Sequence, residues 1–439
     1  MHHYKRFDLR TTHNFSVSDS TEFKKNLLIW ATNFKEVSFL DSNSYKDSFG
    51  SFDALVAVDS NSTLTSSLNS FEKLKKIQNE TKDWIFGYFS YDLKNELENL
   101  KSNNYDGLSF PELYFFQPKK IILVKGTEIQ FLYLNSVEKE AKKDFDTILI
   151  GNLKTKTTLE KSTVKIKMRI SKDAYFNKAK AFLKHIQRGN IYEANFCQEF
   201  YAEKTKIEPI SVYLKLNEIS QAPFATFLKF DNKYLLSASP ERYLKKKGNS
   251  ILSQPIKGTA PRASNTKEDE LLKKQLAKDE KERAENIMIT DLVRNDLSKI
   301  AARGSVKVKE LCKVYTFEQV HQMISTITAR VNEDISPIEI IKATFPMGSM
   351  TGAPKIAALK IIEELEETKR GLYSGAVGYF KPIGDFDFNV VIRSILYNEK
   401  RKYVSYSVGS AITSKSDPDK EYQECLLKAK AMRSVLESN

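Results

Sequence analysis

The sequence has 439 residues, of which 41% are hydrophobic and 28% are charged, values typical of a water-soluble protein with a sizeable core. The net charge is +13, but the lysines are spread along the chain and no nucleic-acid-binding motif accompanies them. The three cysteines form no C-x-x-C pair, the N-terminal residues have no signal-peptide core, and no apolar run is long enough to span a membrane. We therefore expect a cytoplasmic protein that binds neither nucleic acid nor membrane.

Residues 1–160 are expected to form a first region that is rich in strands. Short runs of β-branched and aromatic residues lie at 52–58, 83–93, 113–124 and 129–135. The stretch 154–163 contains few apolar residues and is a predicted linker. The boundary between the first region and the rest of the chain therefore falls within this linker.

Residues 165–436 are expected to form a second region, in which helices and hairpins alternate. Apolar residues recur at helical spacing in 171–189, and a long helix is predicted at 281–300. A hairpin is predicted around Lys247 and Gly248, and strands at 375–380, 388–398 and 403–414. Asp417 and Pro418 supply an N-cap and a first-turn proline for the last helix. This order predicts an α+β fold with antiparallel sheets, in which the two regions are intertwined in one globule.

Two pairs of glutamates have the spacing that a metal site requires. Glu282 and Glu285 are three residues apart on one predicted helix, and Glu421 and Glu424 are three apart on another, so each pair shares a helix face. If the two pairs face each other, they form an oxygen-rich site suited to Mg²⁺. Ordinary surface pairing with Lys428 is the alternative, but Glu285 lies in an apolar segment, where a carboxylate needs a partner or a metal.

Three basic residues are further candidates for chemistry. Lys257 has an apolar neighbour and precedes a Gly-Thr turn, so it is either a nucleophile of lowered pKa or a solvated loop lysine. Arg393 lies inside an apolar strand and is either a fork for a carboxylate or a residue at a strand edge. His321, alone, fits a structural role as well as a functional one. The Gly-rich turn at 345–355 begins a helix, and such turns bind anions.

Taken together and in this order, the motifs resemble those of the chorismate-utilising enzymes. That family comprises aminodeoxychorismate synthases and anthranilate synthase components I, together with isochorismate and salicylate synthases. The first region resembles the family more loosely, through FLDSNSY, FDALVAV and WIFGYFSYDL. The resemblance implies two large antiparallel β-sheets packed together with surrounding helices, and a Mg²⁺-dependent site for chorismate, a dicarboxylate. The matching stretches span about residues 170–435 and are GNIYEANFCQ, SASPERYL, PIKGTAPR, RAENIMITDLVRNDL, FEQVHQMIST, FPMGSMTGAPK, SGAVGYF, FNVVIRS, YSVGSAITSKSDPDKEYQE and KAKAM.

The resemblance also assigns roles to individual residues. Glu285 and Glu424 would ligate Mg²⁺, with Glu282 and Glu421 beside it, and the metal would hold the ring carboxylate. Glu241 would be the general acid and base at the C4 hydroxyl. The residues that would line the substrate are Arg393 and Tyr379, at the enolpyruvyl carboxylate, with Gly258, Thr259, Thr351, Gly409 and Lys428, and with His321 near the ring.

Lys257 distinguishes between the members of the family. The aminodeoxychorismate branch typically has Lys at this position, where anthranilate and isochorismate synthases have Ala. The resemblance implies that Lys257 adds to C2 as the C4 hydroxyl leaves, and that ammonia then enters at C4. It thus implies a transferase that makes 4-amino-4-deoxychorismate for p-aminobenzoate and folate, with ammonia from a separate glutamine amidotransferase subunit. Anthranilate synthase component I is the alternative. The apolar flank and a nearby Mg²⁺ are expected to keep Lys257 unprotonated, with Glu241 able to take up its proton.

The sequence departs from the family's pattern at several positions. Glu193 stands where many members have Gln and where isochorismate synthases have a water-activating Lys, which argues against isochorismate formation. Asn190 and Glu199 replace the more usual Asp and Arg. FLDSNSY lacks the Leu-Leu-Glu-Ser of feedback-regulated anthranilate synthases, which argues against inhibition by tryptophan.

Overall fold

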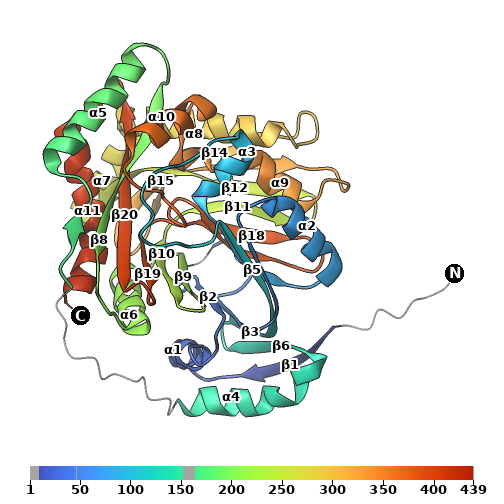
Figure 1. Ribbon diagram of the computed structural model, residues 1–439. Coiled ribbons are helices and arrows are strands. Elements are labelled where there is room, and N and C mark those ends of the chain that lie inside the picture. The colour runs from blue at the N-terminus through green and yellow to red at the C-terminus, as the bar shows by residue number, and fades with distance from the viewer. Residues whose placement is uncertain (1–8, 46, 152–163, 439) are drawn as a thin grey trace.

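The computed structural model describes residues 9–45, 47–151 and 164–438, and the predicted linker at 154–163 lies outside them. Every pairing between the named strands is antiparallel, and helices cover the outside of the sheet (Figure 1), so the α+β expectation is confirmed. The strands are β1 (Arg10–Ser16), β2 (Val37–Asp41), β3 (Ala54–Ser66), β4 (Ile85–Phe89), β5 (Leu113–Lys125), β6 (Glu128–Leu134), β7 (Lys167–Met168), β8 (Glu193–Ala202), β9 (Phe224–Phe230), β10 (Lys233–Ser239), β11 (Arg242–Lys247), β12 (Ser250–Gln254), β13 (Ile256–Pro261), β14 (Lys307–Thr316), β15 (Val320–Arg330), β16 (Gly352–Ala353), β17 (Ala376–Phe380), β18 (Phe386–Val390), β19 (Ser394–Asn398) and β20 (Tyr403–Thr413).

The helices begin and end at recognisable signals. Asp279 and Asp417 cap the two helices that carry the predicted glutamate pairs, and Pro418 occupies the first turn of the second, as predicted. The helices are α1 (Ser20–Ala31), α2 (Ser70–Thr81), α3 (Lys94–Glu98), α4 (Ala141–Ile150), α5 (Lys172–Gln187), α6 (Pro209–Ser220), α7 (Thr266–Lys278), α8 (Glu280–Ser298), α9 (Pro337–Thr344), α10 (Lys355–Leu365) and α11 (Pro418–Glu437), with a 3₁₀ turn, η3, at Gly348–Met350.

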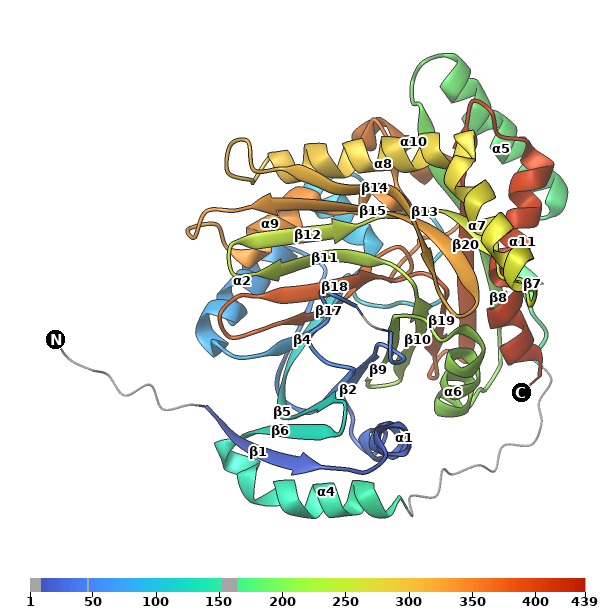
Figure 2. The ribbon, with the colours of Figure 1, turned by 180° about the vertical axis from the view of Figure 1, so that it is seen from behind.

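The two predicted sheets are the two arms of one continuous sheet, which has 20 strands in the described residues. The first arm runs from β14 through β15, β12, β11, β18, β17 and β4 to β5. The second runs from β3 through β2, β9, β10, β19 and β20 to β8. The arms are joined where β5 pairs with β3 (Figure 1). Figure 2 shows the strands of the first arm side by side, from β14 to β4.

Apolar side chains fill the space on both faces of the second arm. One core cluster contains side chains from both arms, for example Leu228 of β9 and Phe388 of β18, so the arms pack face to face as expected for two packed sheets. The other cluster lies between the second arm and the helices α1, α4, α5, α6 and α11. All five residues of β4 and all five of β17 are buried, which explains their apolar and aromatic composition.

The pairing partners cross the boundary between the two predicted regions. β4 pairs with β17, and β2 pairs with β9, so strands from residues 1–160 and from residues 165–436 alternate in the same sheet. No helix in the described part of the chain is long and apolar enough to cross a membrane.

The segment 388–398 was predicted as one strand and is in fact two. β18 ends at Val390 and belongs to the first arm, whereas β19 begins at Ser394 and belongs to the second. Arg393 lies at the crossing with a φ of 52°, a left-handed conformation that breaks the strand. The apolar pattern continues through the break because both arms bury their side chains, so the sequence alone does not reveal it.

Candidate active site

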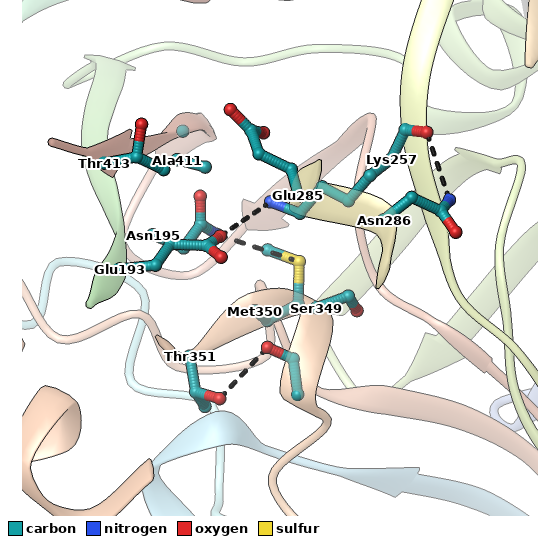
Figure 3. A network of polar contacts seen from close by, with 12 residues as sticks. Glu193, Asn195, Lys257, Glu285, Asn286, Ser349, Met350, Thr351, Ala411 and Thr413 are labelled. Carbon is teal, nitrogen blue, oxygen red and sulfur yellow. Dashed lines mark hydrogen bonds and ion pairs between the residues drawn. The ribbon is translucent and has the colours of Figure 1, made fainter. Parts of the chain in front are cut away.

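Lys257 lies near the start of β13, where the strand departs from regular pairing. The register of β13 against β15 shifts within the strand, and Gly258 has a φ of 95°. A Cβ at Gly258 would lie 3.2 Å from the side chain of Glu282, so a larger residue would disturb α8. Asn286 of α8 donates a hydrogen bond to the carbonyl oxygen of Lys257 (3.2 Å). The Lys257 side chain thus points toward β8 and the Glu193 carboxylate (Figure 3).

The electrostatic environment of Lys257 differs from the one we expected. Its Nζ lies 3.3 Å from Oε1 of Glu193, and Glu285 and Glu424 add further negative charge. Burial lowers the pKa of Lys257, but these carboxylates outweigh burial, and the net pKa is raised above the usual lysine value. These carboxylates therefore favour the ammonium form of Lys257, and the unprotonated amine expected beside Mg²⁺ stays a prediction.

Glu241 lies between β10 and β11, in the turn SPER. Its side chain is buried, and Ser349 of η3 donates a hydrogen bond to its Oε1 (2.6 Å). Burial raises the pKa of Glu241 to about 7, against the opposing effects of Ser349 and of Lys257. A carboxyl group with a pKa near neutrality can both donate and accept a proton at physiological pH, which is what a general acid and base needs.

The glutamates of α8 are held away from water. Glu285 is 7% exposed, and its Oε1 has no hydrogen-bond partner among the described residues. Burial raises the pKa of Glu285 to about 7, although Lys257 opposes the rise. Burial and then the charge of Glu424 raise the pKa of Glu282. These carboxylates cost free energy to bury as ions, so they favour a bound cation or proton.

The glutamates of α11 already have cationic partners. Glu421 is buried and accepts hydrogen bonds from Lys281 (3.1 Å) and Ser416 (2.9 Å). Glu424 pairs with Lys428 (2.5 Å), and although burial raises the pKa of Glu424, this lysine makes the net pKa lower than usual. In this arrangement the described residues contain no group of three or more His, Cys, Asp or Glu placed to hold a metal ion.

Arg393 provides an unpaired cation on the other side of the site. Among the described residues its guanidinium has no ion pair and no hydrogen bond that would satisfy it, and burial lowers its pKa. The groups whose charges act on it are Tyr373 and Glu424. A half-buried guanidinium without a carboxylate partner among the described residues is suited to a carboxylate of the substrate. The assignment of Arg393 to a substrate carboxylate stays a prediction that this unpaired guanidinium favours.

Tyr379, predicted to assist Arg393, lies elsewhere. It is on β17, where its ring packs against Trp84 and Phe86, with centroid distances of 5.3 and 5.7 Å. It lines a separate cavity of about 420 Å³, whose other lining residues include Leu40, Asp41 and Tyr45 of the FLDSNSY region. The tyrosine whose charge acts on Arg393 is Tyr373, in the turn before β17, so these interactions favour Tyr373 over Tyr379 as its neighbour.

His321 lies on β15 with both ring nitrogens engaged. Nε2 is 3.0 Å from Oδ1 of Asp269, and Nδ1 is 3.1 Å from Oγ1 of Thr316. The side chain is fully buried. The structural reading left open by the sequence accounts for all of these contacts, and its predicted position near the substrate ring stays a prediction.

The remaining predicted lining residues lie on four elements around Lys257. Thr351 is buried and donates to Gly348, while Thr259 is exposed on β13. Gly409 of β20 accepts a hydrogen bond from Lys428 (2.9 Å), and a Cβ there would lie 2.5 Å from Sγ of Cys197. Gly409 thus permits the close approach of β20 to β8.

A sequence profile described as chorismate binding enzyme matches residues 28–434, and the chain therefore belongs to this family. The chloroplastic aminodeoxychorismate synthase of Arabidopsis thaliana is 44% identical over 60% of this chain and 28% of that protein. Aminodeoxychorismate synthase component 1 of Klebsiella aerogenes is 33% identical over 80% of this chain and 77% of that protein. Anthranilate synthase component 1 of Saccharolobus solfataricus is 32% identical over 83% of each chain.

Solved structures share the fold over nearly the whole chain. Anthranilate synthase component I of Streptococcus pneumoniae superposes with a TM-score of 0.76, at 24% identity, over 89% of this chain and 94% of that one. The menaquinone-specific isochorismate synthase of Escherichia coli also gives 0.76, at 17% identity, over 97% of this chain and 94% of that one. The chain spans less than a third of the Arabidopsis protein and less than two fifths of the aminodeoxychorismate synthase of Streptomyces griseus.

Proposed function

We propose that this chain converts chorismate and ammonia to 4-amino-4-deoxychorismate, as component I of an aminodeoxychorismate synthase. The observation that carries the proposal is the position of Lys257, whose amine projects into the family's site within reach of Glu193 (3.3 Å). An amine in this place can bond to the substrate carbon next to it. The aminodeoxychorismate synthases among the relatives support the same activity.

The substrate is held by its carboxylates. Arg393 binds the enolpyruvyl carboxylate, because its half-buried guanidinium has no ion pair among the described residues. Tyr373 lies beside this guanidinium and is placed to donate a hydrogen bond to the same carboxylate. These two residues orient the ring so that C2 faces Lys257.

The reaction divides between Lys257 and Glu241. Lys257 bonds to C2 while the C4 hydroxyl leaves, and Glu241 protonates that hydroxyl. Ammonia then bonds to C4 as the lysine leaves C2, and Glu241 takes a proton from the new ammonium group. Glu241 can serve in both directions because burial raises its pKa to about 7.

The glutamates of α8 and α11 have the chemistry to hold Mg²⁺. Glu285 offers a buried oxygen without a hydrogen-bond partner among the described residues, and the charge of Glu424 helps to raise the pKa of Glu282. Glu285 and Glu424 would hold the ion, with Glu282 and Glu421 beside it, once Lys281 and Lys428 release the α11 carboxylates. When bound, Mg²⁺ would neutralise the ring carboxylate and favour the loss of the C4 hydroxyl.

The nitrogen comes from ammonia that a separate glutamine amidotransferase subunit releases. No glutaminase nucleophile is recognisable in the sequence, and the cysteines Cys197, Cys312 and Cys425 are all buried. Glutamine alone should therefore not support the reaction. Ammonium salt should replace the partner in a purified assay.

Anthranilate synthase component I is the second candidate. It is favoured by the Saccharolobus relative, which matches over 83% of both chains. Lys257 argues for the first candidate, because a lysine that bonds to C2 blocks entry of ammonia at that carbon. The two products are therefore distinguishable by where the nitrogen is attached.

Product analysis tests the proposal directly. The purified chain is incubated with chorismate, Mg²⁺ and ammonium salt, with and without an added aminodeoxychorismate lyase. We expect no fluorescent anthranilate, and p-aminobenzoate only when the lyase is present. Anthranilate formed without the lyase would establish the second candidate instead. Full activity in EDTA would exclude the Mg²⁺ assignment.

A further inference from the structure

Glu193 is a buried carboxylate that the chemistry proposed above does not use. It begins β8, where its backbone is held between Ala353 of β16 and Thr413 of β20. Its side chain is 1% exposed. With a strand on each side, Glu193 has little freedom to move, and its position is as well defined as that of the sheet itself.

The contacts of Glu193 are unusually few for a buried carboxylate. Oε1 lies 3.3 Å from Nζ of Lys257, and this is the only ion pair of Lys257 within 4 Å in the described part of the chain. Oε2 is buried and has no hydrogen-bond partner there. Buried carboxylates normally satisfy both oxygens, so half of this one is left without a partner.

The ion pair alone would hinder the reaction of Lys257. An ammonium ion has no lone pair, and a carboxylate beside it stabilises that unreactive form. The proton of Lys257 must therefore move to a nearby base before Nζ can bond to C2. Glu241 is committed to the C4 hydroxyl and accepts a hydrogen bond from Ser349 (2.6 Å), whereas Glu193 already touches Nζ.

We infer that Glu193 is the proton acceptor of Lys257: it takes the proton from Nζ when chorismate fills the site and returns it when the lysine leaves C2. This inference rests on the proposed function and deepens it. It replaces the expectation that Glu241 takes this proton.

The protons and bonds balance in each step. The Lys257 ammonium and the Glu193 carboxylate become an amine and a carboxylic acid, with no net change in charge. The amine then forms the N–C2 bond, and the C4–O bond breaks as Glu241 gives its proton to the leaving hydroxyl, which departs as water. Ammonia forms the N–C4 bond, the N–C2 bond breaks to release a neutral lysine, and Glu241 recovers a proton from the new C4 ammonium. Lys257 and Glu193 then exchange their proton back.

Exclusion of water favours the transfer. In a site closed by the substrate, two neutral groups cost less to bury than an ammonium and a carboxylate that share one contact of 3.3 Å. Oε2 adds to the cost of the ionic form, since no hydrogen bond from the described residues reaches this buried oxygen. After the transfer, Glu193 holds the proton and Lys257 is the neutral amine that the reaction requires.

The other charged groups that face this pair come from three elements. They are Glu241 from the turn between β10 and β11, Glu282 and Glu285 from α8, and Glu424 from α11. All four are carboxylates, so they support the ammonium form of Lys257 and none of them competes as a cation. Because these carboxylates act on the charge of Lys257, every variant is measured in the same buffer and at the same metal concentration.

Glu193→Gln tests the inference because it keeps the size of the side chain and removes the acceptor. Two rates are measured, and the inference predicts that they change in opposite directions. Without substrate, acetic anhydride should acetylate Lys257 faster in the variant than in the wild type across pH 7–9, by about tenfold or more, because the carboxylate no longer stabilises the ammonium ion. With chorismate and no ammonia, the covalent adduct on the Lys257 peptide should form about 10²–10⁴-fold more slowly, because its proton acceptor is gone.

The opposite signs separate proton transfer from other roles. If Glu193→Gln forms the adduct as fast as the wild type, or faster, the carboxylate only stabilises the ammonium and the inference is wrong. If both acetylation and adduct formation fall, Glu193 only positions the lysine, and the inference is also wrong. Glu193→Asp should recover part of the adduct rate, since it restores an acceptor at a longer distance.

Glu199→Gln is the matched control. Glu199 is a buried carboxylate six residues further along β8, and its partners are Tyr403 (2.9 Å) and Arg169 (3.1 Å), not Lys257. Once corrected for the folded fraction, this variant should acetylate and form the adduct like the wild type. A wild-type protein that aminates chorismate at C2 would refute the proposed function, whereas the two Glu193→Gln rates test the acceptor in a protein that aminates C4.

Discussion

Two buried clusters of charge in this molecule are built in opposite ways. In the first, which we call the Arg242 cluster, Arg242 binds Asp387 (2.9 Å) and Asp47 (2.6 Å), and Lys245 also binds Asp387 (3.0 Å). Burial raises the pKa of Asp387, but its cationic partners outweigh burial and the net pKa is lowered. Every charge in this cluster has a partner, and the cluster ties β11 to β18.

In the second cluster, around Lys257, charges are left incomplete. Oxygens of Glu193 and Glu285 have no hydrogen-bond partner in the described residues, and burial raises the pKa of Glu285 to about 7. Arg393 has no carboxylate of its own. The difference teaches how to tell a structural ionic cluster from a functional one: the first satisfies its groups within the protein, and the second leaves them for a ligand.

The largest expected effect is that of Lys257→Ala. This substitution removes the group that we propose bonds to C2, so formation of 4-amino-4-deoxychorismate should fall by about 10³-fold or more. Ammonia could then reach C2, and traces of a C2-aminated product are expected. Chromatography coupled to mass spectrometry measures both products. Near wild-type amination at C4 would show that no covalent step is involved.

Asp387→Ala should act on stability and leave the chemistry intact. It removes the shared partner of Arg242 and Lys245, and breaking a buried ion pair costs about 3–5 kcal/mol of unfolding free energy. Urea unfolding measures this loss, and the rate per folded molecule should stay unchanged. The control is Asp231→Ala, which breaks an exposed pair with Lys35 (2.8 Å) and should change the stability little. Equal losses of unfolding free energy in the two variants would show that the buried cluster is no more important for stability than the exposed ion pair.

Glu285→Gln should increase the stability of the metal-free protein at neutral pH. The pKa of Glu285 is raised in the folded state, so the folded protein binds more protons than the unfolded chain between about pH 5 and pH 7. Wild-type stability should therefore fall as the pH rises through this window. The variant lacks this titration and should be about 1–3 kcal/mol more stable at pH 8 than the wild type. The measurement is urea unfolding in EDTA at pH 5 and pH 8, and an unchanged pH dependence in Glu285→Gln would argue against an unsatisfied carboxylate.

Arg393→Lys should give the smallest effect of the four. The positive charge remains, but the planar fork that binds a carboxylate through two hydrogen bonds is lost. We expect KM for chorismate to rise about tenfold with a smaller change in kcat. Steady-state kinetics at saturating ammonium measure both constants. An unchanged KM would mean that Arg393 does not bind the substrate carboxylate.

The sequence predicted much of the local structure that carries the candidate site residues, because short motifs specify local geometry. The i, i+3 spacing of Glu282 and Glu285, the cap at Asp417 and the hairpin at Lys247 all depend on neighbours within a few residues, and all are present as predicted. The α+β class followed from the order of strands and helices. The sequence did not reveal that the two sheets are continuous, because the β3–β5 pairing is a property of the sheet and not of either strand.

The sequence was least informative where distant strands meet. Tyr379 was assigned to the substrate because it lies in the motif SGAVGYF, but the residue near Arg393 is Tyr373, in the turn before the strand. Glu193 was noted as a departure from the family, yet its contact with Lys257 joins β8 to β13, which are not neighbours in the sheet. Since the carboxylates around Lys257 come from separate elements, the charge on its amine could not be read from the flanking residues.

The pairing of β4 with β17 has a consequence for how the chain matures on the ribosome. Gly87 of β4 lies opposite Gly378 of β17, so about two thirds of the chain is synthesised between these two residues. Until β17 emerges, on the order of tens of seconds later, the apolar edge of β4 (IFGYF) has no partner on that side. A nascent chain therefore carries an apolar strand with an unpaired edge for most of its synthesis, which makes it a natural client for chaperones. A chain truncated before residue 376 keeps this unpaired edge and is expected to aggregate.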